Sequence, residues 1–117
     1  MFLAYDGDKI GRKLESLLID NSEYEIERFA NKVSDALIYL EKSLSERKCK
    51  IIFASGDSVL AKMSDKFDAD EIPRCYGEIT FSLGMGETPL EAMLALKKAK
   101  SEGIAKSCTH SLKGSDK

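Results

Sequence analysis

Asp6 and Asp57 are the residues that most readily suggest chemistry, because each stands beside a glycine next to a short apolar run. A hard divalent cation such as Mg²⁺ takes oxygen ligands, usually one or two carboxylates together with phosphate oxygens and water. Two such ions can activate a hydroxyl and neutralise a leaving pyrophosphate. The alternative is that both are turn residues, since Asp and Gly are favoured in turns for local backbone reasons. The choice depends on whether the fold brings the two carboxylates together.

Short β-prone runs stand next to both aspartates. Residues 2–5 form an apolar run without alternation, which is typical of a strand buried on both faces, and Asp6 follows that run. Residues 51–54 and 58–61 flank Ser55-Gly56-Asp57 with the signature of a β-hairpin. A hairpin lying beside the first strand would bring Asp6 and Asp57 to one end of the sheet.

Two helices are predicted between the first strand and the hairpin. The first runs from Ile10 to about Ile19. Ser22 and Glu25 form a capping box that opens the second, a long amphipathic helix. Its apolar residues recur at steps of three or four and predict a buried face made of Ile26, Phe29, Val33, Leu37, Leu40 and Leu44.

The second half of the chain is predicted to add a strand and a last helix. Residues 64–78 are polar and can hold at most a short helix before a strand at 79–83, which the glycines at 84 and 86 are expected to end. Thr88 and Pro89 open a helix that runs to about Glu102. A weak strand is expected around 104–108, followed by a flexible tail at 109–117.

This order predicts an α+β domain with a mixed sheet covered by helices. It disfavours a phospho-acceptor receiver domain, although an acidic pocket of that kind is roughly mimicked by Asp6, Asp8, Asp57, Thr88 and a C-terminal lysine. Receiver domains alternate strand and helix, whereas residues 10–48 hold two helices with no credible strand between them. Labelling of Asp57 by acetyl phosphate would revive that interpretation.

Composition limits the remaining possibilities. A chain of 117 residues with 43% apolar and 32% charged residues suits one globular domain. A net charge of -2 gives no overall positive field for a nucleic acid polymer, which leaves small phosphorylated ligands. The 3 cysteines form no zinc or disulfide pattern, so a reducing cytoplasm is expected. No apolar stretch approaches the length of about 20 residues that spans a bilayer, so direct membrane insertion is not expected.

Several motifs together resemble known palm domains. Residues 2–12, FLAYDGDKIGR, resemble the D-G-D-x-x-G start of the palm in the large cyclase subunit of type III CRISPR complexes. Ser55-Gly56-Asp57-Ser58 looks like a reduced form of its G-G-D-D hairpin. FSLG at 81–84 and ALKKAKSEG at 95–103 are similar to the end of GGDEF diguanylate cyclases. The short chain looks most like a minimal CRISPR polymerase, a stand-alone palm associated with antiphage systems.

The resemblance implies a ferredoxin-like (RRM-like) palm over residues 1–108, with a mixed or antiparallel sheet of roughly four to five strands. It implies a cyclase that joins nucleoside triphosphates, ATP first among them, into a cyclic oligonucleotide with release of pyrophosphate. The implied metal is Mg²⁺ or Mn²⁺, held by Asp6, the Gly7 carbonyl and Asp57. Lys100 matches a phosphate-contacting lysine. Other residues of the matching segments are expected to bind nucleotide or phosphate: Lys9, Ile10, Gly11, Arg12, Ser55, Gly56, Ser58 and Lys97.

The sequence also departs from the palm pattern. Ser55 replaces the first glycine of the hairpin motif, and Ser58 replaces its second acidic residue. Our hypothesis is that Asp8 supplies the missing carboxylate as a catalytic residue, because it is the other acidic residue next to the site. Two alternatives stay open: a cyclohydrolase-like palm acting on a nucleoside triphosphate, and a degenerate palm that binds nucleotides as a sensor. The resemblance further implies a homodimer with substrates between its palms and, by family alone, a separate membrane effector.

Overall fold

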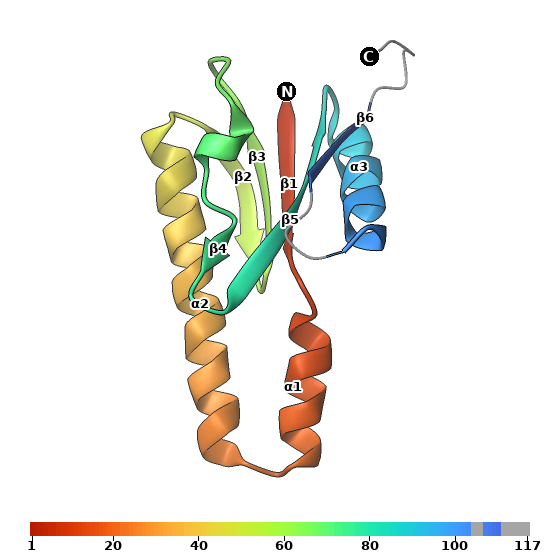
Figure 1. The fold of residues 1–117 in the computed structure, drawn as a ribbon. Helices are drawn as coiled ribbons and strands as arrows, with labels where there is room; N and C mark the ends of the chain where they lie inside the picture. The colour runs from red at the N-terminus through yellow and green to blue at the C-terminus, as the bar shows by residue number, and fades with distance from the viewer. Residues whose placement is uncertain (104–106, 111–117) are drawn as a thin grey trace.

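The computed structural model describes residues 1–103 and 107–110. Its elements follow the predicted order, with a long second helix and a hairpin after it (Figure 1). The exception is a two-residue strand at Cys75–Tyr76, in the segment predicted to hold at most a short helix. The helices are α1 (Ile10–Ile19), α2 (Glu23–Glu46), the 3₁₀ turn η1 (Ala69–Glu71) and α3 (Pro89–Ser101). The strands are β1 (Phe2–Gly7), β2 (Lys50–Ser55), β3 (Ser58–Lys62), β4 (Cys75–Tyr76), β5 (Ile79–Gly86) and β6 (Ser107–His110).

The sheet has the order β2-β3-β1-β5-β4, and every neighbouring pair on this path is antiparallel. β6 also pairs with β5, in the parallel direction. β1 therefore lies in the middle, between the β3 arm of the hairpin and β5 (Figure 1). This arrangement confirms the predicted α+β, ferredoxin-like palm.

One face of the sheet carries the main core. Alternate residues of β1 and β5 are buried and pack against apolar residues of α2, because successive strand side chains point to opposite faces. The predicted face of α2 is largely confirmed: Phe29, Leu40 and Leu44 are buried, while Ile26, Val33 and Leu37 are partly buried. Ala36 joins this face, because its position on the helix lies toward the sheet.

The opposite face of β5 lies under α3. Gly84 lies inside β5, so the prediction that the strand ends at residue 83 is wrong, whereas Gly86 is the last residue of the strand, as predicted. A Cβ atom built at Gly84 would lie 2.2 Å from the Ala92 carbonyl oxygen and 2.2 Å from the Leu96 nitrogen. The two glycines therefore serve close packing of a helix on a strand, which also explains why they interrupt the apolar pattern.

The starts of α2 and α3 follow the predicted caps. The Ser22 hydroxyl accepts a hydrogen bond from the Glu25 backbone N–H, and the Thr88 hydroxyl accepts one from the Glu91 N–H. α1 and the N-terminal half of α2 extend past the end of the sheet as a helical pair (Figure 1). Among the described residues, none of the helices combines the length and apolar character needed to cross a membrane.

The C-terminal end differs slightly from the prediction. β6 includes Thr109 and His110, which the polar composition places in the tail. The weak strand predicted around 104–108 is described from Ser107 and ends later than predicted, at His110, while residues 104–106 lie outside the described residues. The predicted flexible segment at 111–117 lies outside the described residues.

Candidate active site

Asp6 and Asp57 meet at the end of β1 where the hairpin turns. Asp6 is part of β1 rather than following it, and it lies in register with Ser58 of β3 and Ser82 of β5. Gly56 and Asp57 form the turn between β2 and β3, where Gly56 has a φ of 61° that favours glycine. The Gly7 N–H donates to the Asp57 carbonyl at 2.9 Å, which fixes the hairpin tip against β1.

Gly7 allows this close approach. A Cβ atom at this position would lie 2.6 Å from Ile10 Cγ1 and 3.1 Å from the Asp57 Oδ2 atom. Any side chain at residue 7 would therefore push either the start of α1 or the Asp57 carboxylate away. The site requires glycine here for steric reasons.

Lys100 reaches this point from α3. Its ammonium donates to the Gly7 carbonyl at 2.7 Å and lies 3.1 Å from Asp6 Oδ2. The other oxygen of Asp6 accepts a hydrogen bond of 2.5 Å from the Ser58 hydroxyl. The Lys100 ammonium is thus bound by a carboxylate oxygen and a backbone carbonyl oxygen. Both oxygens belong to residues predicted to hold a metal.

Asp57 is a member of the site whose carboxyl has a shifted pKa. Burial, reinforced by the nearby Asp6 carboxylate, raises the pKa of the Asp57 carboxyl. A hydrogen bond to its own backbone and the Lys100 charge act in the opposite direction without cancelling the effect. A carboxylate whose ionisation is disfavoured by burial and by a neighbouring carboxylate is well placed to bind an added cation.

Asp8 lies beside the pair but is enclosed by β5. Its Oδ2 accepts a hydrogen bond of 2.8 Å from the Thr80 hydroxyl, and its Oδ1 accepts one of 2.6 Å from the Ser82 hydroxyl. Its side chain is 4% exposed, and Lys100 lies 3.5 Å away. The hypothesis that Asp8 replaces the missing hairpin carboxylate stays a prediction. Thr80 and Ser82 are not among the residues predicted from sequence, although their alternation with Ile79, Phe81 and Leu83 marks a separate polar face.

The other predicted site residues surround this centre at varying depth. Ile10 packs against Gly7, since its Cγ1 atom would be the nearest neighbour of a Cβ built there, and Ser58 binds Asp6 directly. Lys9 has a left-handed backbone (φ 57°) and stands at the N-cap position of α1, where its side chain makes no capping hydrogen bond. Six of the predicted residues are exposed, and within residues 1–103 their side chains make no hydrogen bond or ion pair with the two aspartates: Lys9, Gly11, Arg12, Ser55, Gly56 and Lys97.

The donor set fits a hard divalent cation. Mg²⁺ is commonly held by one or two carboxylates, with water and substrate phosphates completing its shell. Asp6, Asp57 and the Gly7 carbonyl provide this minimum, and the Lys100 ammonium shows that a positive charge is accommodated there. Within the part of the chain that the structure describes, no group of three or more His, Cys, Asp and Glu side chains is arranged to hold a metal. The site therefore depends on two carboxylates, a carbonyl and a ligand that brings its own oxygens.

A pocket of about 250 Å³ opens next to Asp57, between the first two helices. Its walls are mostly apolar and include Leu14 of α1 with Phe29 and Val33 of α2. Gly56 and Asp57 of the hairpin close one end. The pocket therefore joins an apolar slot to the carboxylates.

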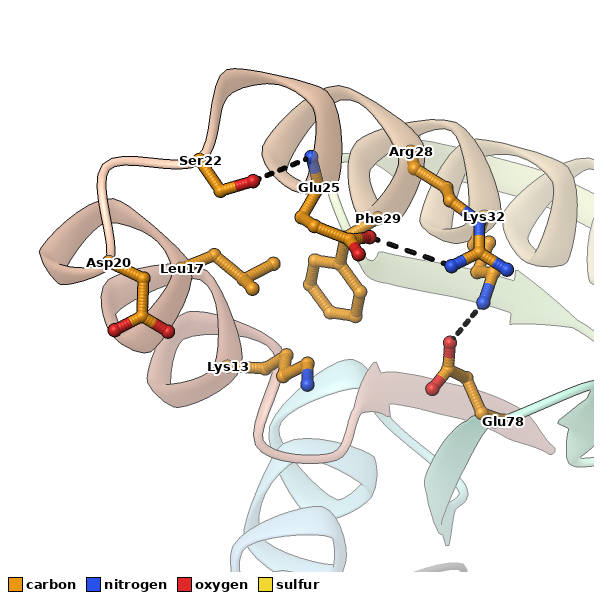
Figure 2. Close-up of a pocket in the computed structure, with 9 residues that line it drawn as sticks. All are labelled: Lys13, Leu17, Asp20, Ser22, Glu25, Arg28, Phe29, Lys32 and Glu78. Carbon is orange, nitrogen blue, oxygen red and sulfur yellow. Dashed lines mark hydrogen bonds and ion pairs between the residues drawn. The ribbon is translucent and has the colours of Figure 1, made fainter.

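A second, charged pocket of about 370 Å³ lies farther along the same helical pair (Figure 2). Leu17 and Phe29 lie in its centre, and Phe29 also lines the apolar slot. Lys32 and Glu78 form a 2.5 Å ion pair at one side, and Lys32 lowers the pKa of the Glu78 carboxyl. Basic and acidic side chains are balanced around it: Lys13, Arg28 and Lys32 with Asp20, Glu25 and Glu78.

Comparison with known proteins identifies a family. A family model described as the minimal CRISPR polymerase domain matches residues 2–110. No curated protein and no solved structure matches the chain. The family match spans every strand and helix of the structure, including Asp6, Asp57 and Lys100.

Proposed function

Because the chain belongs to the minimal CRISPR polymerase family, whose name indicates a polymerase-like nucleotidyltransferase activity, we propose a more specific reaction. The protein joins nucleoside triphosphates, with ATP as the expected substrate, into a cyclic oligonucleotide. Each step forms a bond between a ribose hydroxyl of one nucleotide and the α-phosphorus of another. The bond between the α- and β-phosphates breaks, and pyrophosphate leaves. The proposed setting is antiphage defence in the cytoplasm.

One observation carries this proposal: the Asp6 carboxylate and the Gly7 carbonyl both contact the Lys100 ammonium, at 3.1 and 2.7 Å, next to Asp57. Asp6, Gly7 and Asp57 would hold Mg²⁺ or Mn²⁺. A bound divalent ion would activate the attacking hydroxyl and neutralise charge on the leaving pyrophosphate. Lys100 would bind the phosphates as a second positive charge, which suits a lysine as a phosphate ligand.

The slot beside Asp57 supports a place for the nucleoside. Its apolar walls from Leu14, Phe29 and Val33 suit the faces of a base, while its hairpin end leads to the carboxylates. The charged pocket beyond Phe29 offers donors and acceptors, such as Lys13 and Asp20, to the edge of that base (Figure 2). A nucleotide lying along α1 and α2 would thus present its phosphates to Asp6 and Asp57.

We propose that the active form is a homodimer. Nucleotidyl transfer needs two nucleotides, whereas the slot beside Asp57 has room for one nucleoside. An apolar groove of about 360 Å³ on the α3 side includes Ser58 and is bordered by Phe53 and Leu90, which are 50% and 51% exposed. A second palm on this face would bring its own nucleotide toward the same centre.

The test is incubation of the chain with the four nucleoside triphosphates and Mg²⁺ or Mn²⁺, followed by mass spectrometry. The expected products are a cyclic oligonucleotide and pyrophosphate, and both should disappear with Asp6→Asn and Asp57→Asn. A guanosine product with an opened base ring would replace this proposal with a cyclohydrolase.

Ser58 favours one second candidate, a nucleotide-binding sensor. Its hydroxyl occupies Asp6 Oδ1 at the position where related palms carry an acidic residue, so the site has one carboxylate fewer than their pattern. A sensor would bind a triphosphate measurably by calorimetry and release no pyrophosphate from it. Turnover by the wild-type chain contradicts this candidate.

A further inference from the structure

We propose that Asp8 is a positioning residue for Lys100 and that the hydroxyls of Thr80 and Ser82 hold Asp8 in this role. The effect of this positioning on turnover rests on the proposed function, whereas the positioning of Lys100 by Asp8 does not. This assignment differs from a metal-ligand role for Asp8, and the two roles predict different outcomes below.

The contacts of Asp8 leave its carboxylate committed to the protein. Thr80 donates to one oxygen at 2.8 Å and Ser82 to the other at 2.6 Å. Both donors come from the face of β5 that lies under α3, and the Asp8 N–H also donates to the Thr80 carbonyl at 2.9 Å. The residue is therefore fixed to β5 through its backbone and through both carboxylate oxygens.

The surroundings of Asp8 make direct coordination of a metal costly. Its side chain is 4% exposed, compared with 31% for Asp6. An ion entering there would have to lose most of its water and displace a hydroxyl from the carboxylate, and Mg²⁺ gives up water reluctantly. The more accessible Asp6 and Asp57 carboxylates are the easier ligands.

Lys100 has an acceptor on each of three successive residues. Its ammonium lies 3.1 Å from Asp6 Oδ2, 2.7 Å from the Gly7 carbonyl and 3.5 Å from Asp8 Oδ1. Two of these acceptors are the proposed metal ligands. When a divalent ion takes them, Asp8 is the acceptor that stays with Lys100 and keeps the ammonium beside the phosphates.

Ser82 makes this arrangement rigid because it is itself fully buried. Its exposed fraction is 0%, and its hydroxyl donates to the same oxygen, Oδ1, that faces Lys100. The hydroxyl thus sets the direction of the charge that Lys100 meets. Loss of either hydroxyl should loosen Asp8 first and Lys100 through it.

The positioning is tested by NMR of lysine side-chain ammonium groups in ¹⁵N-lysine-labelled protein, without nucleotide or metal. Lys100→Met assigns the Lys100 signal. Asp8→Asn is expected to shift and broaden this signal, and the Thr80→Val, Ser82→Ala double variant is expected to do so more weakly. Ser101→Ala, which removes a hydroxyl next to Lys100 that donates to the Lys98 carbonyl, is the matched control and should leave the signal unchanged.

An unchanged Lys100 signal in folded Asp8→Asn protein would overturn the proposal. Circular dichroism establishes that each variant is folded. If Asp8→Asn does not fold, the nearly isosteric Thr80→Val variant gives the deciding comparison with Ser101→Ala. Because this measurement uses neither substrate nor ion, its result is independent of whether the proposed reaction occurs.

Kinetics and metal binding then separate positioning from coordination. Asp8→Asn should raise the KM for the triphosphate about tenfold with kcat within about threefold, because a charge-assisted contact to Lys100 is lost. In a Lys100→Met background, Asp8→Asn should have no further effect on KM, and Mn²⁺ affinity should stay within about twofold. A further tenfold loss of Mn²⁺ affinity in that background would assign Asp8 to the metal and reject the positioning role.

Discussion

The two faces of β1 and β5 differ in the size and polarity of their side chains. The face toward α2 carries large buried side chains, among them Leu3, Tyr5 and Phe81. The face toward α3 carries small and polar residues, including Asp6, Ser82 and Gly84, and the buried residues of α3 that oppose it are mainly alanines. Large side chains on the first face keep helix and sheet apart, whereas small ones on the second let α3 lie directly on β5.

The difference explains how one small sheet supports both a core and a site. Apolar burial on the α2 face contributes most of the stabilisation, since it scales with the apolar area removed from water. The α3 face buries less apolar area because its side chains are small and polar. The close packing that they allow brings the Lys100 ammonium within 3.1 Å of Asp6 Oδ2. Substitutions should therefore separate into effects on folding and effects on chemistry according to the face they touch.

The largest effect is expected from Asp6→Asn on the α3 face. Pyrophosphate release should fall at least about a thousandfold, because the variant lacks one of the charges proposed to hold the metal, a loss equivalent to about 4 kcal/mol. Asp35→Asn, an exposed position on α2, is the matched control and should leave the rate unchanged. A stopped assay for pyrophosphate measures both, and equal rates in the two variants would contradict the division between faces.

Gly84→Ala should destabilise the fold by about 3 kcal/mol, because its methyl group would overlap the α3 backbone and small-to-large changes at tight contacts cost about that much. Gly11→Ala, in the first turn of α1, is the matched control: no atom lies within 4 Å of its added Cβ, so it should not destabilise the fold. Urea unfolding measures both changes. A Gly84→Ala variant as stable as wild type would show that α3 is not packed directly on β5.

The smallest effect is expected on the metal-free thermal stability of Asp57→Asn, and this effect depends on pH. The pKa of Asp57 is raised, so the folded chain binds the proton more tightly than the unfolded chain does. The folded state is favoured by this group at a pH below the usual carboxyl range, and this advantage is lost as the pH rises through the raised pKa. Without metal, Asp57→Asn should therefore melt slightly above wild type at pH 7 and level with it near pH 3.

Thermal melts with added Mg²⁺ complete that comparison. The ion should raise the melting temperature of wild type, because it offsets the repulsion between Asp6 and Asp57. It should leave Asp57→Asn unchanged. An equal Mg²⁺ response of the two proteins would exclude Asp57 from the site.

The α2 side of the molecule is well predicted from sequence because its signals are local or periodic. The capping hydroxyl of Ser22 and the steps of three and four along α2 correspond directly to the structure, and on the α3 side the same holds for the local cap at Thr88. Asp6 and Asp57 are also predictable, since each carries a glycine neighbour and a flanking strand. The hairpin pattern predicts that Asp57 lies in a turn, whereas the pairing of β3 with β1, which brings it to Asp6, is seen in the structure.

The packing on the α3 side is harder to predict, because the role of each residue there depends on a contact with a residue distant in the sequence. Gly84 and Gly86 have the local pattern of a strand end, although their role is set by a helix that passes above them. The alternation of Thr80 and Ser82 with apolar residues indicates a polar strand face but does not reveal their partner Asp8, which lies 72 and 74 residues earlier in the chain. Such long-range contacts leave no periodicity in the sequence.

The most direct test of the metal site is Mn²⁺ binding, followed by the electron paramagnetic resonance signal of the free ion in the presence of a non-hydrolysable ATP analogue. We predict that the wild-type chain and Asp35→Asn remove Mn²⁺ from solution, and that Asp6→Asn and Asp57→Asn do so at least about tenfold less tightly. Equal Mn²⁺ affinity in all four proteins would contradict the claim that Asp6 and Asp57 form a metal site.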